Sequence, residues 1–404
     1  MTGPLEGLRV LDLTRVMAGP WCTQILADLG AEVIKIERPV LGDDTRHWGP
    51  PWLKDGAGND TSESAYYLST NRGKHSVAVD IASDAGKQII RDLAAKSDFF
   101  IENFKVGGLA RLGLGYDDIR AVNPEIIYLS LTGFGQTGPM ASQPGYDYLV
   151  QARGGLMSVT GPADGEPQRS GLAVGDLTTG MYATIGLLSA LQHRHRTGQG
   201  QYIDLALLDT QVGWLANQAM NYFVSGNVPR RTGKWHANLV PYQPFDASDR
   251  PVIIAVGNDG QFAKLCQFIG RPELIVDARF ATNPVRIANR VALETELAAE
   301  IIKHDSEYWL EHLPKQGVPA CPINDIEQAF QEPQVQHRGM KIDLPHPLAG
   351  SVPGVANPLK FSETPVSYEK APPLLGEDTD AVLSRMLDMS DEQLCELRKK
   401  GVLQ

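Results

Sequence analysis

Short apolar runs alternate with amphipathic segments through the first third of the chain. Residues 8–13 and 31–37 are mostly apolar, and residues 21–30 between them repeat apolar side chains at helical spacing. The middle segment ends at Gly30, a residue type that commonly follows the last turn of a helix. A strand, a helix and a strand joined by short turns predict a right-handed parallel crossover.

The same alternation continues to residue 134. Repeated strand–helix units of this kind predict an α/β fold with a mostly parallel, Rossmann-like sheet. Strands are expected at 76–81, 98–103 and 125–134, and helices at 84–97 and 117–122.

The apolar pattern changes twice in the rest of the chain. It predicts an extended segment at 171–174, a helix at 177–196, a strand at 201–209 and a helix at 210–226. Loop-forming residues follow until a new strand-to-helix unit begins near residue 250, and proline is frequent after residue 330. We therefore expect a large domain at 1–224, a smaller α/β domain at 225–329 and a C-terminal return to the large domain at 330–404.

The overall charge disfavours a nucleic-acid-binding surface, because the 404 residues carry a formal net charge of −11. The four cysteines lie far apart without zinc-binding spacing, so we expect free thiols in a reducing compartment and no metal site. The sequence shows neither the pattern of a signal peptide nor an apolar stretch long enough to span a bilayer. We expect a cytoplasmic protein that binds neither nucleic acid nor membrane.

Asp176 is the one acidic residue of a run of small and apolar residues, GLAVGDLTTGMYATIGLL. It falls at the start of an expected helix, where aspartate is a favoured N-cap that stabilises a helix by about 1 kcal/mol. The alternative is a nucleophilic carboxylate, which the positive end of the helix dipole would keep ionised and which the neighbouring glycines leave accessible. The residues themselves leave both interpretations open.

Polar side chains after expected strand ends offer further candidate contacts. Asn103, Lys105 and Arg111 follow the strand at 98–103, where ligands of parallel sheets collect, although a solvated loop has the same pattern. Arg38 follows the strand at 31–37, but the turn before that strand lacks the glycine fingerprint of a dinucleotide site. The loop at 42–52 contains aromatic and cationic residues that can close over a ligand or pack internally.

Several segments together resemble the class III CoA-transferase family, in the family's order and over almost the whole chain. They include GDDTRHWGPP, ENFKVGGLARLGLGY, LTGFGQTGP, PGYDYLVQARGG, GDLTTGMYA, RTGQGQYIDLALLD and GVPACPIND. The resemblance implies an enzyme with no permanently bound cofactor, with a coenzyme A thioester and a small carboxylic acid as substrates. It also implies two chains interlocked in a homodimer.

The resemblance implies roles for individual residues. Asp176 matches the nucleophile. The positions that match coenzyme A contacts are Met17, Ala18, Arg38, Val79, Asn103, Phe104, Lys105 and Arg111. The positions expected near the substrate are Arg15, Arg46, Trp48 and Tyr146, with Arg15 and Arg46 favoured over Arg72 and Arg169 for holding a remote carboxylate. Arg15 stands where formyl-CoA transferases have histidine, and the segment 236–245 stands where they have a run of glycines.

The implied reaction moves coenzyme A from an acyl-CoA, expected to be succinyl-CoA, to a short dicarboxylic acid. It passes through a mixed anhydride and a thioester on the aspartate. One alternative is a racemase-like isomerase of the same fold, which uses a histidine where this chain has Tyr146, a poor base at neutral pH. Another alternative is a non-catalytic protein that binds coenzyme A.

Overall fold

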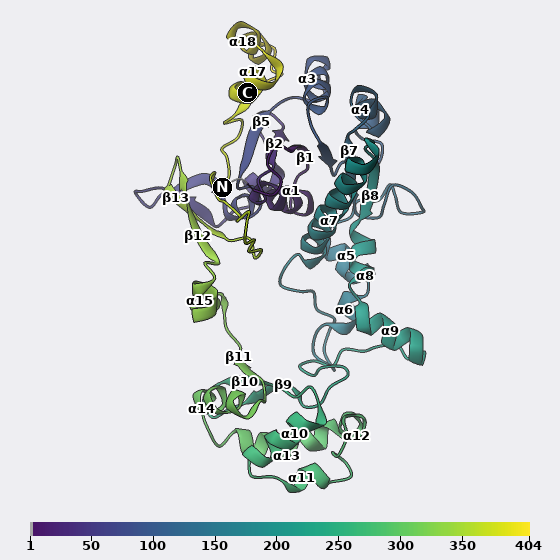
Figure 1. Ribbon diagram of the computed structural model, residues 1–404, viewed down its shortest axis with the longest axis vertical. Coiled ribbons are helices and arrows are strands. Elements are labelled where there is room, and N and C mark those ends of the chain that lie inside the picture. The colour runs from purple at the N-terminus through teal and green to yellow at the C-terminus, as the bar shows by residue number, and fades with distance from the viewer. Residues whose placement is uncertain (1–2) are drawn as a thin grey trace. The chain divides into compact units, whose positions relative to one another are not determined.

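The computed structural model describes residues 3–404 and divides into two compact units. The first unit comprises the chain up to Leu156, Ser170–Met220 and Gln336–Gln404, and the second comprises Met157–Arg169 and Asn221–Val335 (Figure 1). The domain boundaries expected at residues 224 and 329 stay a prediction. No helix within residues 3–404 is both long and apolar enough to cross a membrane.

A six-stranded parallel sheet forms the centre of the first unit, which confirms the predicted α/β fold. Its strands are β1 (Arg9–Leu13), β2 (Glu32–Glu37), β5 (Lys74–Ala78), β6 (Phe99–Glu102), β7 (Ile127–Thr132) and β8 (Tyr202–Ala206). The order is β5-β2-β1-β6-β7-β8, and every neighbouring pair is parallel. The chain therefore leaves β1 toward one edge and returns at β6 toward the other, the switch point at which open parallel sheets bind ligands.

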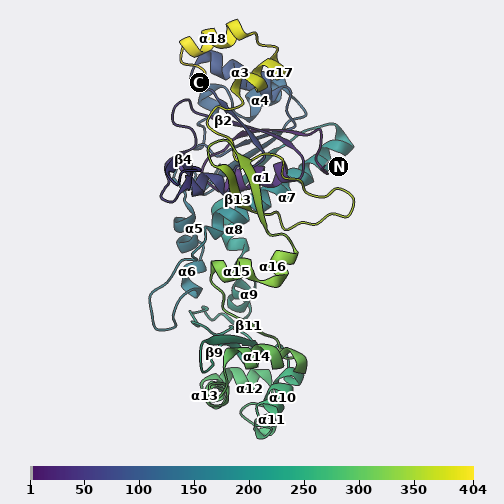
Figure 2. The same cartoon turned by 90° about the vertical axis from the view of Figure 1, so that its left-hand side faces the viewer.

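Alternate strand residues face helices on the two sides of this sheet (Figures 1 and 2). Val10, Val33 and Ile101 pack with α1 (Ala18–Asp28) and α7 (Val174–Thr197). The intervening residues Leu11, Ile34 and Phe100 belong to the opposite core, with α3 (Asp84–Ala94), α4 (Tyr116–Val122), α17 (Thr379–Leu387) and α18 (Asp391–Lys399). Both faces are covered, which explains why these strands read as continuous apolar runs.

Three expectations for residues 171–226 are wrong in detail. Residues 171–174 form no strand, because α7 already begins at Val174. The strand expected at 201–209 ends at Ala206, where α8 (Leu207–Gly213) begins. The helix expected at 210–226 is broken by a turn at Trp214 and Leu215, and α9 (Ala216–Ser225) begins at Ala216, whose φ is 41°. Gly213 ends α8 because glycine disfavours a helix interior.

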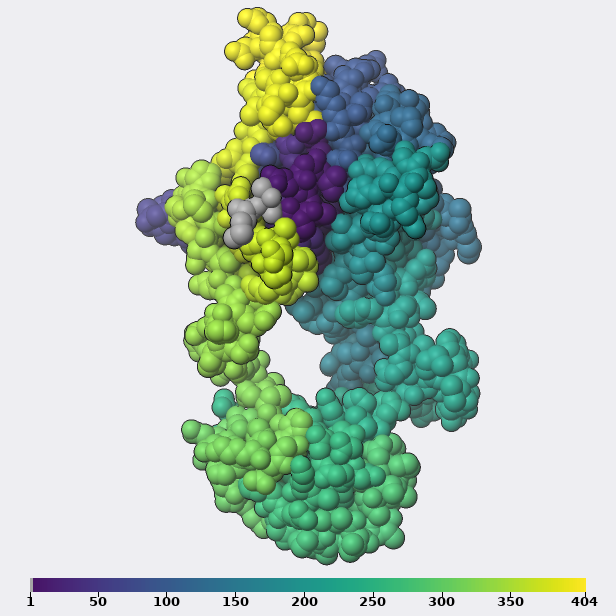
Figure 3. Space-filling model, in the orientation of Figure 1, coloured from purple at the N-terminus to yellow at the C-terminus, as the bar shows by residue number. Residues whose placement is uncertain are grey.

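The C-terminal segment packs on the first unit. Its hairpin is formed by β12 (Lys341–His346) and β13 (Gly350–Val355), and Asp378 accepts a hydrogen bond from the Ser76 amide of β5 at 2.9 Å. Figure 3 shows the C-terminal helices, in yellow, beside the blue segment that contains α3, and α17 and α3 are in contact.

The other short elements complete the two units. Those of the first unit are η1 (Asp44–His47), β3 (Trp52–Lys54), β4 (Asp60–Ser64), α2 (Ala65–Leu68), η2 (Ala110–Leu112) and α5 (Asp147–Arg153), and α6 (Leu156–Val159) begins at the last residue of the segment up to Leu156 and continues into the second unit. The second unit has an antiparallel sheet in the order β11 (Ala320–Pro322), β10 (Pro251–Ala255), β9 (Tyr242–Asp246). Its helices are α10 (Asp259–Phe268), α11 (Glu273–Val276), α12 (Asn283–Ala288), α13 (Arg290–Ile301), α14 (Ser306–His312), η3 (Pro314–Gln316) and α15 (Ile326–Gln331), and α16 (Pro333–His337) follows.

Candidate active site

Two cavities lie at the carboxyl ends of the parallel strands. Cavity A, of about 210 Å³, is lined by residues that follow β1, β6 and β7 and by Asp176 of α7. Cavity B, of about 280 Å³, is lined by residues at and after the ends of β1, β2 and β5. Arg15 and Phe104 line both cavities, so the two are neighbours across the switch point of the sheet, and we call them together the path.

The structure brings together most of the residues expected at the site. Cavity A is lined by Arg15, Met17, Ala18, Asn103, Phe104, Lys105, Tyr146 and Asp176. Cavity B is lined by Arg15, Arg38, Val79 and Phe104. Arg46, Trp48 and Arg111 are outside both linings. Segments that are 160 residues apart in the chain thus converge on one path.

Asp176 is the third residue of α7, whose N-cap is Ala173. Burial, followed by the negative charge of Asp147, raises the pKa of Asp176 to about 7. The expectation that the helix terminus keeps Asp176 ionised is therefore wrong, because loss of solvation outweighs the dipole. A half-buried carboxylate with this pKa on the wall of a cavity is typical of a functional acid.

A second aspartate, which the sequence analysis missed, caps α7. Asp147 begins α5, and its Oδ1 accepts hydrogen bonds from the amides of Gly175 at 2.8 Å and Asp176 at 3.4 Å. Its Oδ2 accepts from the Gln151 side chain at 2.6 Å. Asp176 is thus not the residue that caps its own helix, which removes the main structural explanation for it. The only signal in the sequence was the position of Asp147 directly after Tyr146.

Close packing between α1 and α7 brings the two helix starts together. A Cβ added at Gly180 would lie 2.7 Å from the Ala18 carbonyl oxygen and 2.9 Å from the Trp21 ring. Only glycine permits this approach. It places Met17 and Ala18 on the same cavity wall as Asp176.

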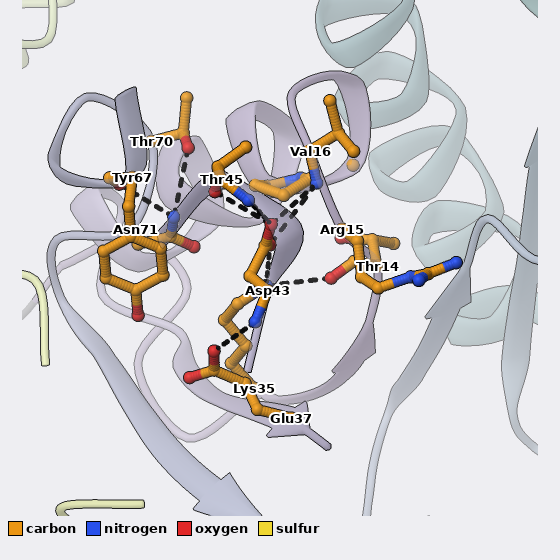
Figure 4. Close-up of polar contacts among 12 residues, drawn as sticks. Thr14, Arg15, Val16, Lys35, Glu37, Asp43, Thr45, Tyr67, Thr70 and Asn71 are labelled. Atoms are coloured by element: carbon orange, nitrogen blue, oxygen red, sulfur yellow. Dashed lines mark hydrogen bonds and ion pairs between the residues drawn. The ribbon is translucent and has the colours of Figure 1, made fainter. Parts of the chain in front are cut away.

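A buried ion pair fixes the turn after β1 (Figure 4). The Lys35 ammonium contacts Asp43 at 2.9 Å, both side chains have no exposed surface, and Lys35 also donates to the Thr14 carbonyl at 2.8 Å. The Asp43 carboxylate in turn accepts a hydrogen bond from the Val16 amide, which lies 3.2 Å from Oδ1 and 3.3 Å from Oδ2. Val16 has a φ of 74°, a strained conformation for a β-branched residue that the surrounding contacts must maintain.

Asn103 holds the same turn from the neighbouring strand. Its Oδ1 accepts the Arg15 amide at 3.0 Å, and its Nδ2 donates to the Arg15 carbonyl at 2.7 Å. The side-chain amide that was expected to contact coenzyme A is therefore engaged in positioning Arg15. The turn is held on both sides, by Asp43 and by Asn103.

Arg15 is the arginine that faces the path. Its Nη1 contacts Asp44 Oδ2 at 3.1 Å, with 42% of each side chain exposed, and its guanidinium lies 5.4 Å from the centre of the Phe104 ring. Its Nε is buried and has no hydrogen-bond partner among residues 3–404. A buried N–H without a partner, on a side chain that lines both cavities, can donate a hydrogen bond to an anionic ligand.

Arg46 belongs to the interior of the fold, which argues against its expected contact with substrate. It pairs with Glu37 at 2.8 Å and with Glu63 at 3.3 Å, and these three side chains are nearly completely buried. Arg72 is likewise buried against Asp28 at 2.6 Å. Both guanidinium groups neutralise internal carboxylates, so neither is available to a ligand.

Trp48 lines neither cavity. Its ring contacts Tyr66 edge-on, with centroids 5.0 Å apart. Burial, and then the charges of Asp176 and Asp147, raise the pKa of Tyr66 to about 12. Trp48 therefore packs on a tyrosine that shares the electrostatic environment of Asp176.

Similarity to known proteins agrees with this geometry. The family model described as CoA-transferase family III matches residues 5–379. A protein of Agrobacterium fabrum named succinate–glutarate CoA-transferase is 47% identical over 383 residues, which cover 95% of this chain and 96% of that protein. The human protein named succinyl-CoA:glutarate CoA-transferase is 44% identical over 402 residues, which cover 99% of this chain and 90% of its own.

A crystal structure of a CAIB/BAIF family protein from Brucella suis superposes with a TM-score of 0.85 and is 47% identical, covering 96% of this chain and all of that one. A Mycobacterium tuberculosis structure has a TM-score of 0.83 and is 32% identical, covering 94% of this chain and 99% of its own. The sequence match, the fold and the acid at the sheet's switch point agree, and the chain is an enzyme of CoA-transferase family III.

Proposed function

We propose that this enzyme transfers coenzyme A from a dicarboxylyl-CoA such as succinyl-CoA to a short dicarboxylic acid, with Asp176 as the nucleophile. The observation that carries the proposal is the half-buried carboxylate with a pKa of about 7 on cavity A, which shares Arg15 and Phe104 with the neighbouring cavity B. The printed names of the Agrobacterium fabrum and human relatives support the choice of dicarboxylates.

The two cavities match the two ends of an acyl-CoA. Ile36, Val79 and Ile81 give cavity B apolar walls for a base, and Arg38 at its edge supplies a charge for phosphate. Phe104 and Arg15 flank the passage toward cavity A, which we assign to the thioester. Lys105 and Arg111 remain the further coenzyme A contacts that the family resemblance implies.

The first half-reaction loads the enzyme. An Asp176 oxygen attacks the thioester carbonyl, the C–S bond breaks, and coenzyme A leaves as the thiolate from an aspartyl–acyl anhydride. The thiolate then attacks the Asp176 carbonyl carbon of the anhydride. The C–O bond to the donor acyl group breaks, which releases the donor acid as a carboxylate and leaves an Asp176–coenzyme A thioester.

The second half-reaction reverses these bonds with a new acid. The acceptor carboxylate attacks the Asp176 thioester carbonyl, forming a new anhydride and expelling the thiolate. The thiolate attacks the acceptor acyl carbon, which forms the product thioester and regenerates the Asp176 carboxylate. No water or nucleoside triphosphate is consumed, because each activated bond is exchanged for another.

The environment of Asp176 suits this sequence of steps. A carboxylate whose pKa is about 7 is roughly half ionised at neutral pH and is a stronger nucleophile, once ionised, than one with an ordinary pKa. Acylation then removes its charge. The incoming acceptor carboxylate therefore meets a neutral ester-like group instead of a repelling anion.

Arg15 is our candidate for the remote carboxylate of the substrate. Its guanidinium lines cavity A, and its Nε has no partner among the described residues. Asp44, which also lines cavity A, holds the guanidinium in place through Nη1. The other two arginines weighed within the first unit, Arg46 and Arg72, are committed to internal carboxylates.

We also propose that the enzyme is an interlocked homodimer. Large apolar side chains on α7 and at the end of α8 are about half exposed in the single chain, among them Tyr182 and Ile185 of α7, Val212 of α8 and Trp214 directly after it. Rows of this kind on a water-exposed helix mark a protein contact. Light scattering that gives the mass of one chain at micromolar concentration would contradict this assignment.

A substrate panel tests the function. The enzyme is mixed with succinyl-CoA and one of several short mono- and dicarboxylic acids, and new thioesters are identified by mass spectrometry. We expect dicarboxylates to be converted and the Asp176→Asn variant to be inactive. Incorporation of solvent deuterium at the α-carbon without any exchange of acids would instead indicate an isomerase.

A further inference from the structure

Asp147 reaches the first turn of α7 from a different helix, 29 positions earlier in the chain than Asp176. Its Oδ1 accepts the amides of Gly175 and Asp176 at 2.8 and 3.4 Å, and its Oδ2 accepts from Gln151 at 2.6 Å. Gln151 is fully buried and is itself fixed, because its Oε1 accepts the Ser170 amide at 2.9 Å. The position of the Asp147 carboxylate is therefore determined on both sides.

We propose that Asp147 is a positioning residue for the nucleophile: it fixes the first turn of α7 and places a fixed negative charge next to the Asp176 carboxylate. This inference rests on the proposed function. Asp147 does not line cavity A, so its effect on the reaction passes through Asp176.

The first consequence is geometric. Free amides at a helix start attract the nearest carboxylate, and for α7 the nearest acid in sequence is Asp176 itself. Because Asp147 already occupies those amides, the Asp176 side chain is released to face cavity A. Gly175 provides the space for this contact, since a Cβ at this position would lie 2.9 Å from Asp147 Oδ1 and 3.0 Å from Val150.

The second consequence is electrostatic. Burial and the Asp147 charge both favour the protonated form of Asp176, and Asp147 is the only charged side chain among the causes of its raised pKa. Other ionisable groups belong to elements that pack against α7 or line cavity A. On the packing elements they are Cys22 and Asp28 of α1, Tyr148 and Arg153 of α5, Tyr128 of β7, Tyr202 and Asp204 of β8 and Asp209 of α8. Tyr66 of α2 senses the Asp176 charge, and the wall of cavity A adds Arg15, Asp44, Lys105 and Tyr146.

A neutral residue at position 147 is expected to change the rate of acyl loading in opposite directions at acidic and at alkaline pH. Without the neighbouring charge, Asp176 ionises at a lower pH, so acyl loading becomes faster at acidic pH relative to the alkaline plateau. The carboxylate also becomes a weaker nucleophile, so the plateau itself falls. The two pH profiles are therefore expected to converge or cross, which a general loss of structure cannot produce.

The test is the single-turnover rate of acyl loading onto Asp176 from succinyl-CoA between pH 5.5 and 8.5. The wild-type rate should rise with a midpoint near pH 7. In Asp147→Asn we expect a midpoint lower than in the wild type and a plateau about 3- to 10-fold lower, because a general acid–base or nucleophilic group loses reactivity with its pKa. Asp117→Asn, which removes an exposed acid from α4, is the charge-matched control and should keep the wild-type midpoint.

Asp147→Ser provides a second neutral variant, whose hydroxyl oxygen can still accept a hydrogen bond from the Gly175 amide. It serves if the Asn side chain disturbs the contact with Gln151. An unchanged midpoint in a folded neutral variant would overturn the inference. Peptide mapping of the wild-type adduct keeps the two proposals apart. An adduct on another residue would overturn the proposed function, whereas an adduct on Asp176 with an unchanged midpoint would overturn only the role of Asp147.

Discussion

Replacing Lys35 with methionine tests how the turn after β1 is held. Lys35 and Asp43 are 2.9 Å apart with no exposed surface, and Lys35 also satisfies the Thr14 carbonyl. Methionine fills much of the same volume but leaves the Asp43 charge and that carbonyl without their cation. Breaking one side of a buried pair typically costs 3–5 kcal/mol, so we expect Lys35→Met to lower the free energy of unfolding by about 4 kcal/mol.

Urea denaturation followed by circular dichroism measures this loss. Lys87→Met is the matched control, because Lys87 contacts Asp84 at 3.0 Å at the surface and its loss should cost less than about 1 kcal/mol. The double variant Lys35→Met/Asp43→Leu should recover part of the stability, since it removes the orphaned charge. A Lys35→Met variant within about 1 kcal/mol of the wild type would refute the reasoning.

The loss of unfolding free energy in Lys35→Met should also depend on pH, in a direction that the pKa of Asp43 determines. Burial acts to raise the pKa of Asp43, but the Lys35 ammonium and the Thr45 hydrogen bonds hold it below its usual value. The stability that Asp43 contributes is therefore present at neutral pH and is lost as the pH falls. Without Lys35 the carboxyl can take up a proton at a higher pH, so the destabilisation should be smaller at pH 5 than at pH 8.

Three other predictions concern the site. Arg15→Met should raise the KM for dicarboxylate acceptors about 10- to 100-fold, because a charged hydrogen bond is lost, while the KM for a monocarboxylate of equal length should change little. Equal changes in the KM of both acids would argue against the assigned contact. Gly180→Val should destabilise the first unit by about 1–3 kcal/mol, because its Cβ would meet Ala18, whereas Gly186→Ala, with its nearest neighbour at 3.8 Å, should be neutral or stabilising in a thermal melt. Asp176→Asn should raise the free energy of unfolding at pH 8 and do so less at pH 5. The pKa of Asp176 is raised from 3.8 to about 7 on folding, so the stability cost of this carboxyl grows between these two pH values and is complete only above about pH 7; a pH-independent difference would contradict it.

The sheet could be predicted from the sequence because its signals are local. The strands β1, β2, β6 and β7 lie in short, mostly apolar runs between turn residues, and the glycine after α1 marks the end of that helix. The same local logic failed between α8 and α9, where a continuous apolar pattern hides a break at Ala216. Periodicity reports which residues face the core and does not report where the backbone turns.

The site could be predicted only in part, because charge in a sequence carries no information about burial. Arg46 was expected to face a ligand, but Glu37 and Glu63 from two other elements enclose it. Neither Lys35 nor Asp43 was predicted to have a structural role, although they form a buried ion pair that supports the turn after β1. Asp147 was missed because its contact with α7 depends on the packing of α5, which no local pattern reveals.

Peptide mapping of the trapped enzyme tests the central claim most directly. The protein is incubated with succinyl-CoA without an acceptor, treated with hydroxylamine and analysed by mass spectrometry. The account predicts a hydroxamate on Asp176, absent from Asp176→Asn. A hydroxamate on a different residue, or full turnover by Asp176→Asn, would contradict it.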